Sequence, residues 1–404
     1  MNPKSSSPES EEPQEGPPYP LSALLHENAS LSDVTSDGSP SLQTLNDKLR
    51  KGERLTVEDG LFLYEKAPLT WLRERADVMR QRLHGDEAFY NRNIHFEPTN
   101  TCVYACKFCA FYRPPKAGAA EGVWDYSLED LRSKLAAYPI GSLTEIHITG
   151  GVHPDRGVEY GESICAFVKS IRPEIHIKAF TAVEISYFAR KSGITVTETL
   201  ERLKKSGLDS LPGGGAEIFD PEIRKHIAGG KAPAHTWLEV HEAAHQIGLL
   251  SNATMLYGHV ESYRHRIDHM RRLRELQDRT HGFKSFIPLR YRNESNALSH
   301  IDEVGPEEDL RNYAVARLFL DNIPHLKAYW VMLGLDLAET ALDYGVDDLD
   351  GTVDDTTRIY SMAGGMVHPG VTSEELRRRI RSKGRAPMER DSEYRKILKP
   401  NLKE

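Results

Sequence analysis

Between about residue 91 and residue 355, short β-rich segments alternate with longer amphipathic segments. The short segments predict strands at 93–99, 144–150, 175–181, 208–213, 249–257, 285–291 and 328–333. Most of the stretches between them have room for a helix, as in SLEDLRSKLAAY (127–138) and VTETLERLKKSG (196–207). Repeated strand–helix–strand units indicate right-handed crossovers and a parallel sheet. The pattern therefore predicts an α/β fold, a (βα)-barrel or partial TIM-like barrel of parallel strands, with a doubly wound open sheet as the alternative.

The two flanks of this core have patterns of their own. Residues 46–90 have helical periodicity, with Thr56 as a predicted N-cap and Pro68 ending the run. Residues 1–45 carry seven acids and one lysine and have little apolar surface, so we predict a disordered acidic tail. Residues 356–404 are predicted as a basic C-terminal helical extension packed on the barrel. We therefore expect four regions: 1–45, 46–90, 91–355 and 356–404.

Composition narrows the class of protein. Hydrophobic content is 39% and charged content 28%, which is typical of a soluble globular protein. No apolar run approaches the roughly 18 residues that cross a bilayer, and the net charge of −8 argues against broad nucleic-acid affinity. Three of the four cysteines are crowded together, which is unlike an extracellular disulfide framework and favours a reducing cytoplasm.

The crowded cysteines form a C-x3-C-x2-C motif directly after the first predicted strand. Cys102, Cys106 and Cys109 would therefore lie at the carboxyl-end rim of the barrel, where such folds place their chemistry. A closed structural zinc site needs four ligands, usually as two separated pairs, and the remaining Cys165 falls in a predicted helix. Three thiolates suit a 4Fe–4S cluster with one iron left open for a further ligand.

The segment CVYACKFC, including the aromatic Phe108 before the last cysteine, resembles the signature of radical S-adenosylmethionine (SAM) enzymes. The resemblance implies one 4Fe–4S cluster ligated by Cys102, Cys106 and Cys109. It also implies that the open iron binds the amino and carboxylate groups of SAM, a co-substrate that is split to a 5′-deoxyadenosyl radical.

Further stretches resemble the aminodeoxyfutalosine synthases of menaquinone biosynthesis: HITGGVHPD (147–155), HIKAFTAVEI (176–185), GLDSLPGGGAEIFDPEIR (207–224), AYWVMLGLDLA (328–338) and DDLDGTV (347–353). This resemblance runs from about residue 50 to the C-terminus. It implies addition of the adenosyl radical to the enol-ether double bond of 3-(1-carboxyvinyloxy)benzoate, with rearrangement and decarboxylation, to give 6-amino-6-deoxyfutalosine. The alternatives within the class are a cyclic dehypoxanthine futalosine synthase or a deazaflavin (FO) synthase subunit, which abstract hydrogen and release 5′-deoxyadenosine.

The resemblance also implies residues that hold the co-substrate. Phe111 and Tyr112 follow the last cysteine, where backbone and aromatic atoms of the family meet adenine. Gly150 and Gly151 end the second strand and would let the methionine part of SAM approach the backbone.

Acidic and basic residues complete the predicted site. Glu184 is assigned to a ribose hydroxyl or the methionine ammonium, and Glu217, after PGGG, to the ribose or the cluster-bound amino group. The implied substrate has two carboxylates, for which bidentate arginines are expected. Arg290 and Arg292 alternate at the end of the sixth strand, so one faces inward, and Arg290 is our candidate.

The segment HEAAH at 241–245 is a literal H-E-x-x-H motif, which indicates a different class of function, zinc binding. On a helix, two histidines four residues apart share a face and can bind zinc. The helix would lie in the crossover between the fourth and fifth strands, in the outer layer, and no third ligand follows at the longer zincin spacing. We interpret it as a solvated helical face, as we do His265 and His269. The opposing hypothesis is a non-catalytic zinc-binding protein, colourless where the radical hypothesis predicts brown, iron-containing protein.

The predicted partners are a small-molecule substrate and a source of electrons. The chain carries no second cluster motif, so reduction is expected from an external flavodoxin or ferredoxin.

Overall fold

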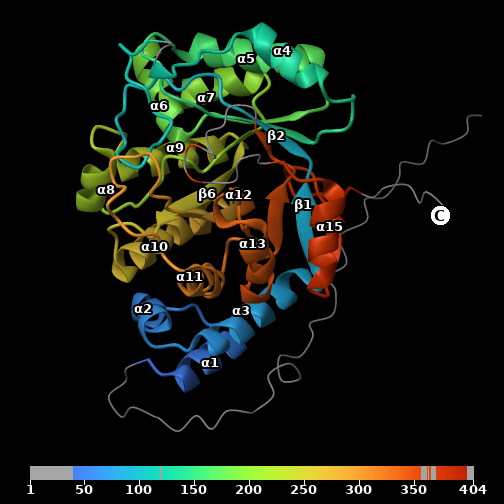
Figure 1. The fold of residues 1–404 in the computed structure, drawn as a ribbon. Helices are drawn as coiled ribbons and strands as arrows, with labels where there is room; N and C mark the ends of the chain where they lie inside the picture. The colour runs from blue at the N-terminus through green and yellow to red at the C-terminus, as the bar shows by residue number, and fades with distance from the viewer. Residues whose placement is uncertain (1–39, 119–120, 356–361, 363, 365–369, 398–404) are drawn as a thin grey trace, which may run out of the picture.

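The computed structural model describes residues 40–118, 121–355, 362, 364 and 370–397 (Figure 1). The predicted acidic tail up to Ser39 therefore lies outside the described residues, as does most of 356–369. The first helix begins at Leu42, inside the range predicted as tail, because Ser41 caps its N-terminus by accepting a hydrogen bond from Thr44 N.

A parallel sheet of eight strands forms the centre of the molecule. Each strand from β2 to β8 pairs with the next along the chain, and β10 pairs with β2. The strands are β2 (Asn93–Phe96), β3 (Glu145–Ile148), β4 (His176–Ala179), β5 (Ser210–Leu211), β6 (Leu250–Tyr257), β7 (Phe283–Arg290), β8 (His325–Leu326) and β10 (Asp354–Asp355). Because parallel neighbours need a crossover, a helix follows nearly every strand.

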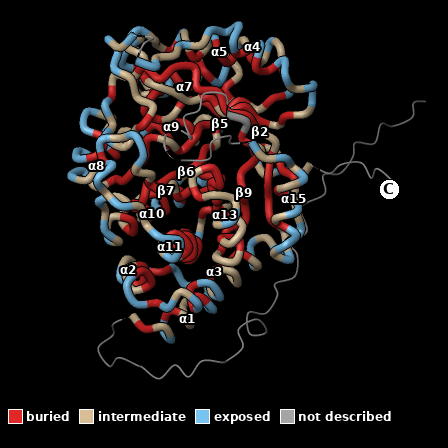
Figure 2. The backbone as a smooth tube through the Cα atoms, in the orientation of Figure 1, coloured by how far each residue is buried: buried red, intermediate tan, exposed pale blue. Residues whose placement is uncertain are grey.

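The crossover helices form the outer layer. They are α4 (Leu128–Ala136), α5 (Val158–Ile171), α6 (Ala182–Ser192), α7 (Val196–Lys205), α8 (Pro221–Ala228), α9 (Ala234–Gln246), α10 (Tyr263–Thr280) and α11 (Pro306–Phe319). Local sequence sets their ends: Ser127 and Thr181 begin α4 and α6 with capping boxes, and Gly193 ends α6 in the left-handed region. Figure 2 shows the strands in the buried interior and exposed residues on the outer helices.

The segment 347–355 joins the two edges of the sheet. At one edge, Asp347 N donates to Leu326 O (3.1 Å) and Ala328 N donates to the carbonyl of Asp348 (2.9 Å), which links β8 to β9 (Asp348–Gly351). At the other edge, β10 pairs with β2. The prediction of a (βα)-barrel or partial TIM-like barrel of parallel strands is confirmed.

The predicted strand at 328–333 is wrong. Strand β8 lies earlier, at His325–Leu326, and Trp330–Leu333 forms the short helix α12. An apolar run of this length does not distinguish a strand from a buried helical turn by periodicity alone. Here Trp330 is buried and its indole Nε1 donates to Gly351 O (2.9 Å), so the run packs under the closing segment instead of joining the sheet. Helix α13 (Leu335–Ala341) and the 3₁₀ turn η3 (Leu342–Tyr344) follow.

The two ends of the described chain meet on one side of the barrel. Helices α1 (Leu42–Lys51), α2 (Val57–Glu65) and α3 (Leu69–His84) lead into β1 (Glu87–Asn91). A second parallel sheet has the order β11–β1–β9, with β11 (Ala386–Glu389) supplied by the C-terminal segment after α15 (Ser373–Ser382). Thr56 is the N-cap of α2, as predicted.

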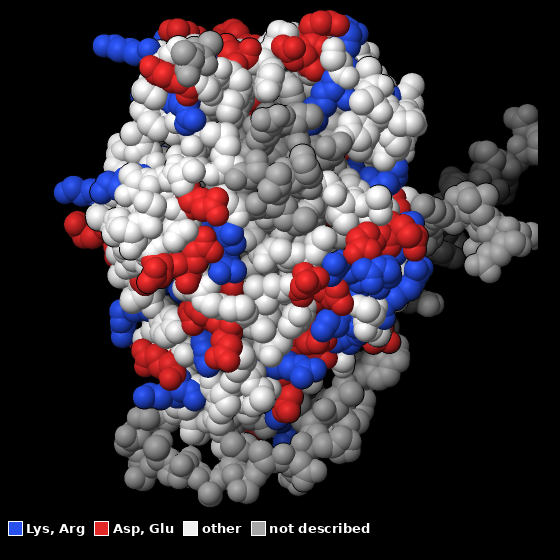
Figure 3. All heavy atoms as spheres, in the orientation of Figure 1, with Lys and Arg blue, Asp and Glu red and all other residues white. Residues whose placement is uncertain are grey.

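Neither a membrane-spanning helix among the described residues nor a broad basic patch on the face drawn in Figure 3 is found. Among the described helices, none combines the length and apolar character that a bilayer crossing needs. Figure 3 shows basic and acidic side chains interspersed over the face that it draws.

Candidate active site

A cavity of about 290 Å³ opens at the carboxyl ends of the barrel strands. Every strand from β2 to β8, or the loop after it, contributes to the wall. The lining includes Cys102, Cys106, Phe108, Cys109, Phe111 and Tyr112 after β2; Thr149–Val152 after β3; Thr181 and Val183 after β4; Gly214, Gly215 and Glu217 after β5; Leu256 on β6; Leu289–Arg292 at the end of β7; and Tyr329 and Met332 after β8. In barrels of this kind the strand ends are where chemistry is placed.

The loop that carries the three cysteines is held in place by backbone hydrogen bonds to several distant segments. Cys102 N donates to Arg113 O (3.0 Å), and Val103 N donates to Val152 O (2.9 Å). Lys107 N donates to Ile227 O at the end of α8 (2.8 Å). The loop is therefore shaped by the fold and turns all three thiols into one cavity.

The spacing of the thiols fits a cluster better than a single ion. Within the described ranges, the only His, Cys, Asp or Glu group whose ligand atoms all lie within 4.8 Å of one another contains none of these cysteines. Zinc–sulfur bonds of about 2.3 Å in a tetrahedron bring thiolates to about 3.8 Å from each other. Three thiols in one cavity, set wider apart than that, suit the larger body of an iron–sulfur cluster. Cys165 is fully buried in α5 and lies outside the cavity, as its separate place in the sequence predicted.

Burial controls the protonation of these thiols. It raises the pKa of Cys102 and Cys106, and it raises the pKa of Cys109 to about 12. Thiols in such surroundings keep their protons until a metal replaces them. Three such thiols lining one cavity form a donor set that fits a thiolate-ligated metal group.

Gly150 and Gly151 bring the end of β3 against the cysteine loop. A Cβ built on Gly151 would lie 2.3 Å from Thr101 O, and one built on Gly150 would lie 2.8 Å from Thr99 O. Gly151 N also donates to Thr99 O (2.7 Å). The contact that these glycines permit in the structure is with the loop backbone, and both residues line the cavity; their role toward the co-substrate stays a prediction.

Glu184 lies behind the cavity wall and is not part of its lining. Its Oε2 accepts hydrogen bonds from Thr181 N (2.7 Å), Thr181 Oγ1 (2.8 Å) and Thr149 Oγ1 (3.1 Å). Burial raises the pKa of Glu184 to about 7, although these donors lower it. The carboxylate fixes two hydroxyl-bearing side chains that do line the cavity, and its contact with the co-substrate stays a prediction.

Glu217 does line the cavity, and it is paired with a lysine that the sequence analysis missed. Glu217 has a left-handed backbone (φ 48°), and its Oε1 lies 2.5 Å from Lys231 Nζ. Burial opposes both charges, but the pairing prevails: the pKa of Glu217 lies below its ordinary value and that of Lys231 above. Lys231 also lies 5.6 Å from the ring centre of Phe108. A lone lysine after two glycines forms no motif, so no sequence signal identified it.

Both candidate arginines line the cavity. The prediction that only one of them faces inward is wrong, because residues two apart in a strand share a face; in addition, β7 ends at Arg290, so Arg292 lies beyond the strand. Arg290 Nη1 lies 3.2 Å from Asp309 Oδ2, and Arg292 Nε lies 3.2 Å from Glu303 Oε1. Burial raises the pKa of Asp309 to about 6, while hydrogen bonding from Tyr257 and the charge of Arg290 lower it. The guanidinium groups are thus anchored at the mouth of the barrel.

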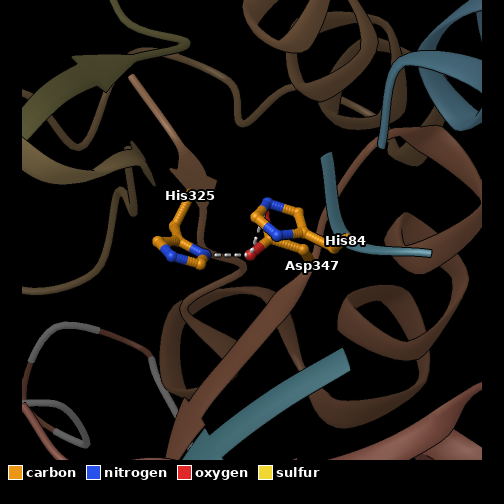
Figure 4. Close-up of side chains that lie close together, drawn as sticks. All are labelled: His84, His325 and Asp347. Carbon is orange, nitrogen blue, oxygen red and sulfur yellow. Dashed lines mark hydrogen bonds and ion pairs between the residues drawn. The ribbon is translucent and has the colours of Figure 1, made fainter. Parts of the chain in front are cut away.

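The one compact set of candidate metal ligands in the described chain is His84, His325 and Asp347, at the opposite end of the barrel (Figure 4). The Asp347 carboxylate accepts from His325 Nδ1 (2.6 Å) and is ion-paired with Arg317. The two imidazole rings are stacked at 16° with centres 4.6 Å apart, so their in-plane lone pairs do not converge on one point. His84 Nε2 is hydrogen-bonded to Pro324 O (2.9 Å) and lies 3.6 Å from Asp347 Oδ2. We interpret this set as a structural clasp between α3, β8 and β9.

The HEAAH histidines of α9 are not a solvated face, and that interpretation is wrong. His241 is fully buried, and both His241 Nδ1 (2.8 Å) and His245 Nε2 (2.7 Å) bind Ser251 Oγ. His269, on α10, is likewise buried and its Nε2 binds Thr254 O (2.8 Å). Helix periodicity places these rings against the barrel wall, where they serve as hydrogen-bonded core residues.

Comparison with known proteins agrees with this geometry. The model of the Radical SAM superfamily matches residues 96–273, and that of the CofH/MqnC C-terminal region matches residues 280–402. The aminodeoxyfutalosine synthase of Thermus thermophilus is 44% identical over 89% of this chain and 96% of its own length. The aminodeoxyfutalosine synthase of Streptomyces coelicolor is 40% identical (87% and 92%), as is the cyclic dehypoxanthine futalosine synthase of that organism (88% and 89%).

Solved structures share the fold. The FeFe-hydrogenase maturase HydG from Carboxydothermus hydrogenoformans superposes with a TM-score of 0.69 at 17% identity, covering 88% of this chain and 80% of that one. Methylornithine synthase (PylB) superposes with a TM-score of 0.65 at 16% identity, covering 85% and 97%. The barrel, the cysteine motif and the extent of these matches together confirm the predicted family: the chain belongs to the radical SAM superfamily, among the enzymes that carry the CofH/MqnC C-terminal region.

Proposed function

We propose that this chain is an aminodeoxyfutalosine synthase, a radical SAM transferase of menaquinone biosynthesis. The observation that carries the proposal is the 44% identity to a protein of that name over 96% of its length, together with three thiols facing one strand-end cavity. The cyclic dehypoxanthine futalosine synthase of Streptomyces coelicolor, at 40%, is the alternative that the test must separate.

The cavity fits the cofactors of the superfamily, a 4Fe–4S cluster and SAM. Cys102, Cys106 and Cys109 are the proposed cluster ligands, leaving one iron for SAM. When bound, this pair supplies a 5′-deoxyadenosyl radical, and the proposed reaction is its addition to the enol-ether double bond of 3-(1-carboxyvinyloxy)benzoate, with rearrangement and loss of carbon dioxide, to give 6-amino-6-deoxyfutalosine.

The protein's own part in the proposed reaction is to bind SAM and the substrate, to orient them, and to exclude water. Phe111, Tyr112, Gly150 and Gly151 form the wall on the cysteine side, where we propose that SAM lies. Buried apolar residues pack around Cys106 and Phe108 and keep water away from a radical that would otherwise react with stray hydrogen donors: Ile227, Ala228, Leu256, Tyr291 and Leu298.

Charged residues supply orientation. We propose that Glu217, held by Lys231, accepts hydrogen bonds from the ribose or the amino group of SAM, and that Glu184 acts on the same region through Thr149 and Thr181. Arg290, anchored on Asp309, is proposed to bind a substrate carboxylate. Such positioning of a double bond against a radical carbon is where most of the protein's contribution lies.

Two expectations complete the proposal. An external flavodoxin or ferredoxin would supply the electron, and the reducing cytoplasm is the compartment that suits a thiol-ligated cluster.

The proposal is tested by anaerobic reconstitution with iron and sulfide, followed by reductant, SAM and 3-(1-carboxyvinyloxy)benzoate, with mass spectrometry of the nucleosides formed. A decarboxylated adenosyl adduct is expected, and Cys106→Ala, as the control, should abolish both iron binding and product. If the native enzyme forms only 5′-deoxyadenosine, the radical chemistry stands and the substrate assignment is wrong.

A further inference from the structure

A second cavity, of about 170 Å³, lies next to the first and deeper in the barrel. Five residues line both cavities, so the two are continuous: Thr149, Thr181, Gly214, Leu289 and Tyr329. The interiors of such barrels are ordinarily filled by bulky branched side chains. Here polar and charged side chains take part in the lining as well, namely His95, His147, Lys178, Asn252, Thr254, Lys327 and Asp350. The deep cavity therefore forms a floor beneath the thiol-bearing chamber, and this floor carries polar and charged groups within a largely apolar wall.

His147 places an unpaired ring nitrogen in this floor. It faces inward from β3, in register with His95 on β2 and Lys178 on β4, and its ring packs edge-on against His95 at 4.6 Å. His147 Nε2 is buried, yet it has no hydrogen-bond partner among the described residues. Burial, with the nearby charge of Lys178, lowers the pKa of His147 well below its ordinary value, so the ring stays neutral. A buried polar atom left unpaired in a cavity wall points to a ligand.

Two ammonium groups stand on the same floor, each held by one acid. Lys178 Nζ lies 2.5 Å from Glu145 Oε1, and Lys327 Nζ lies 2.9 Å from Asp350 Oδ1. An ammonium has three N–H donors, and these pairings use one of them in each lysine. Asp350 has a left-handed backbone (φ 64°) within the segment that closes the barrel, which aims its carboxylate at Lys327. The two lysines are thus fixed in position, and each keeps N–H donors that can bind an anionic ligand.

We propose that this deep cavity binds the ring carboxylate of the substrate, and that His147 is the residue that determines specificity for it. The inference rests on the proposed function and deepens it. The proposed substrate has one carboxylate on its benzene ring and the other on its enol-ether arm, so the ring carboxylate enters the floor while the enol-ether arm stays in the upper chamber beside SAM. Arg290 lines that chamber, so in this orientation it would face the enolpyruvyl carboxylate. A single orientation then satisfies both carboxylates and presents the double bond to the radical carbon.

The test separates the ring carboxylate from the rest of the substrate. Equilibrium dialysis of the reconstituted enzyme, under anaerobic conditions and without SAM, measures binding of two probes: 3-(1-carboxyvinyloxy)benzoate and 2-phenoxyacrylate, which lacks the ring carboxylate. His147→Phe keeps a ring against His95 but removes the N–H group. We expect it to weaken binding of the dicarboxylate about tenfold or more, the scale of a hydrogen bond to a charged group. Binding of 2-phenoxyacrylate should stay within about twofold.

Matched variants separate a contact from a disturbance of the fold. His153→Phe makes the same change six positions further on, outside both cavities, and should bind both probes like the native enzyme. His147→Gln restores a donor and should recover part of the affinity for the dicarboxylate. Thermal unfolding of His147→Phe should match that of the native protein, because Nε2 loses no partner; if this variant does not fold, His147→Leu takes its place.

Each outcome decides between the claims. Equal weakening of both probes by His147→Phe, or no weakening of either, overturns the assignment of His147 while the proposed function stands on product formation. If the native enzyme cleaves SAM but binds neither probe, the proposed substrate is wrong and this inference falls with it.

Discussion

Gly151→Ala should damage the cysteine loop without touching a cysteine. The added Cβ would lie 2.3 Å from Thr101 O and 2.7 Å from Thr101 C, where ordinary contact begins at 3.4 Å. These are backbone atoms directly before Cys102, so the loop itself must move by about 1 Å, since no flexible side chain is there to yield. Overpacking of this kind costs about 1–3 kcal/mol of unfolding free energy, and a displacement of about 1 Å near reacting groups costs on the order of a hundredfold in rate.

The assay measures iron per chain after reconstitution, together with urea unfolding of the metal-free protein. We expect Gly151→Ala to bind distinctly less iron and to unfold at lower urea. Gly118→Ala is the matched control: it lies in the same long loop, is exposed, and a Cβ there meets nothing within 4 Å. Native iron content and native stability in Gly151→Ala would refute the claim that β3 and the loop are packed as closely as described.

Three other changes give independent checks. Asp347→Asn should lower the unfolding free energy in urea by about 3–5 kcal/mol, because Arg317 is left buried without its ion pair. The pKa of Asp347 is depressed in the folded protein, so the stabilisation is full above the ordinary pKa of an aspartate and is lost as pH falls below it. A cost under about 1 kcal/mol would contradict the clasp. Burial raises the pKa of Glu184 from 4.5 to about 7, so between these pH values the folded protein holds a proton on Glu184 that the unfolded chain has lost. The unfolding free energy therefore falls by about 3 kcal/mol as pH rises through this range. Glu184→Gln should reduce this pH dependence when unfolding is compared at pH 5 and pH 8. Cys165→Ala should leave iron content unchanged, and a loss of iron would place this thiol at the cluster.

Most of the fold was within reach of the sequence because it depends on short-range patterns. Six of the seven predicted strand segments overlap observed strands, and the helix starts at Thr56, Ser127 and Thr181 follow from local capping chemistry. The seventh segment failed because tertiary packing of Trp330 decided between strand and helix. Closure of the barrel by 347–355 could not be predicted from local sequence patterns, since β9 contacts β8 and β10 pairs with β2, which lies far away in the chain.

The site divides in the same way. The cysteines were identified because ligand spacing is written in the sequence, and their neighbours follow along the loop. Lys231 and His147 have no such spacing: each is a single polar residue, and only the fold brings one to Glu217 and turns the other into the barrel. The HEAAH motif shows the reverse error, because a pattern suited to zinc is satisfied here by Ser251 inside the core.

The central claim, addition of the adenosyl group to the substrate, is tested most directly with two labels. Reconstituted enzyme is given reductant, SAM labelled in the adenine ring and 3-(1-carboxyvinyloxy)benzoate labelled in the benzoate ring. The account predicts one product that contains both labels and has lost carbon dioxide. Recovery of the adenine label in 5′-deoxyadenosine alone, with the benzoate label unchanged, would contradict it.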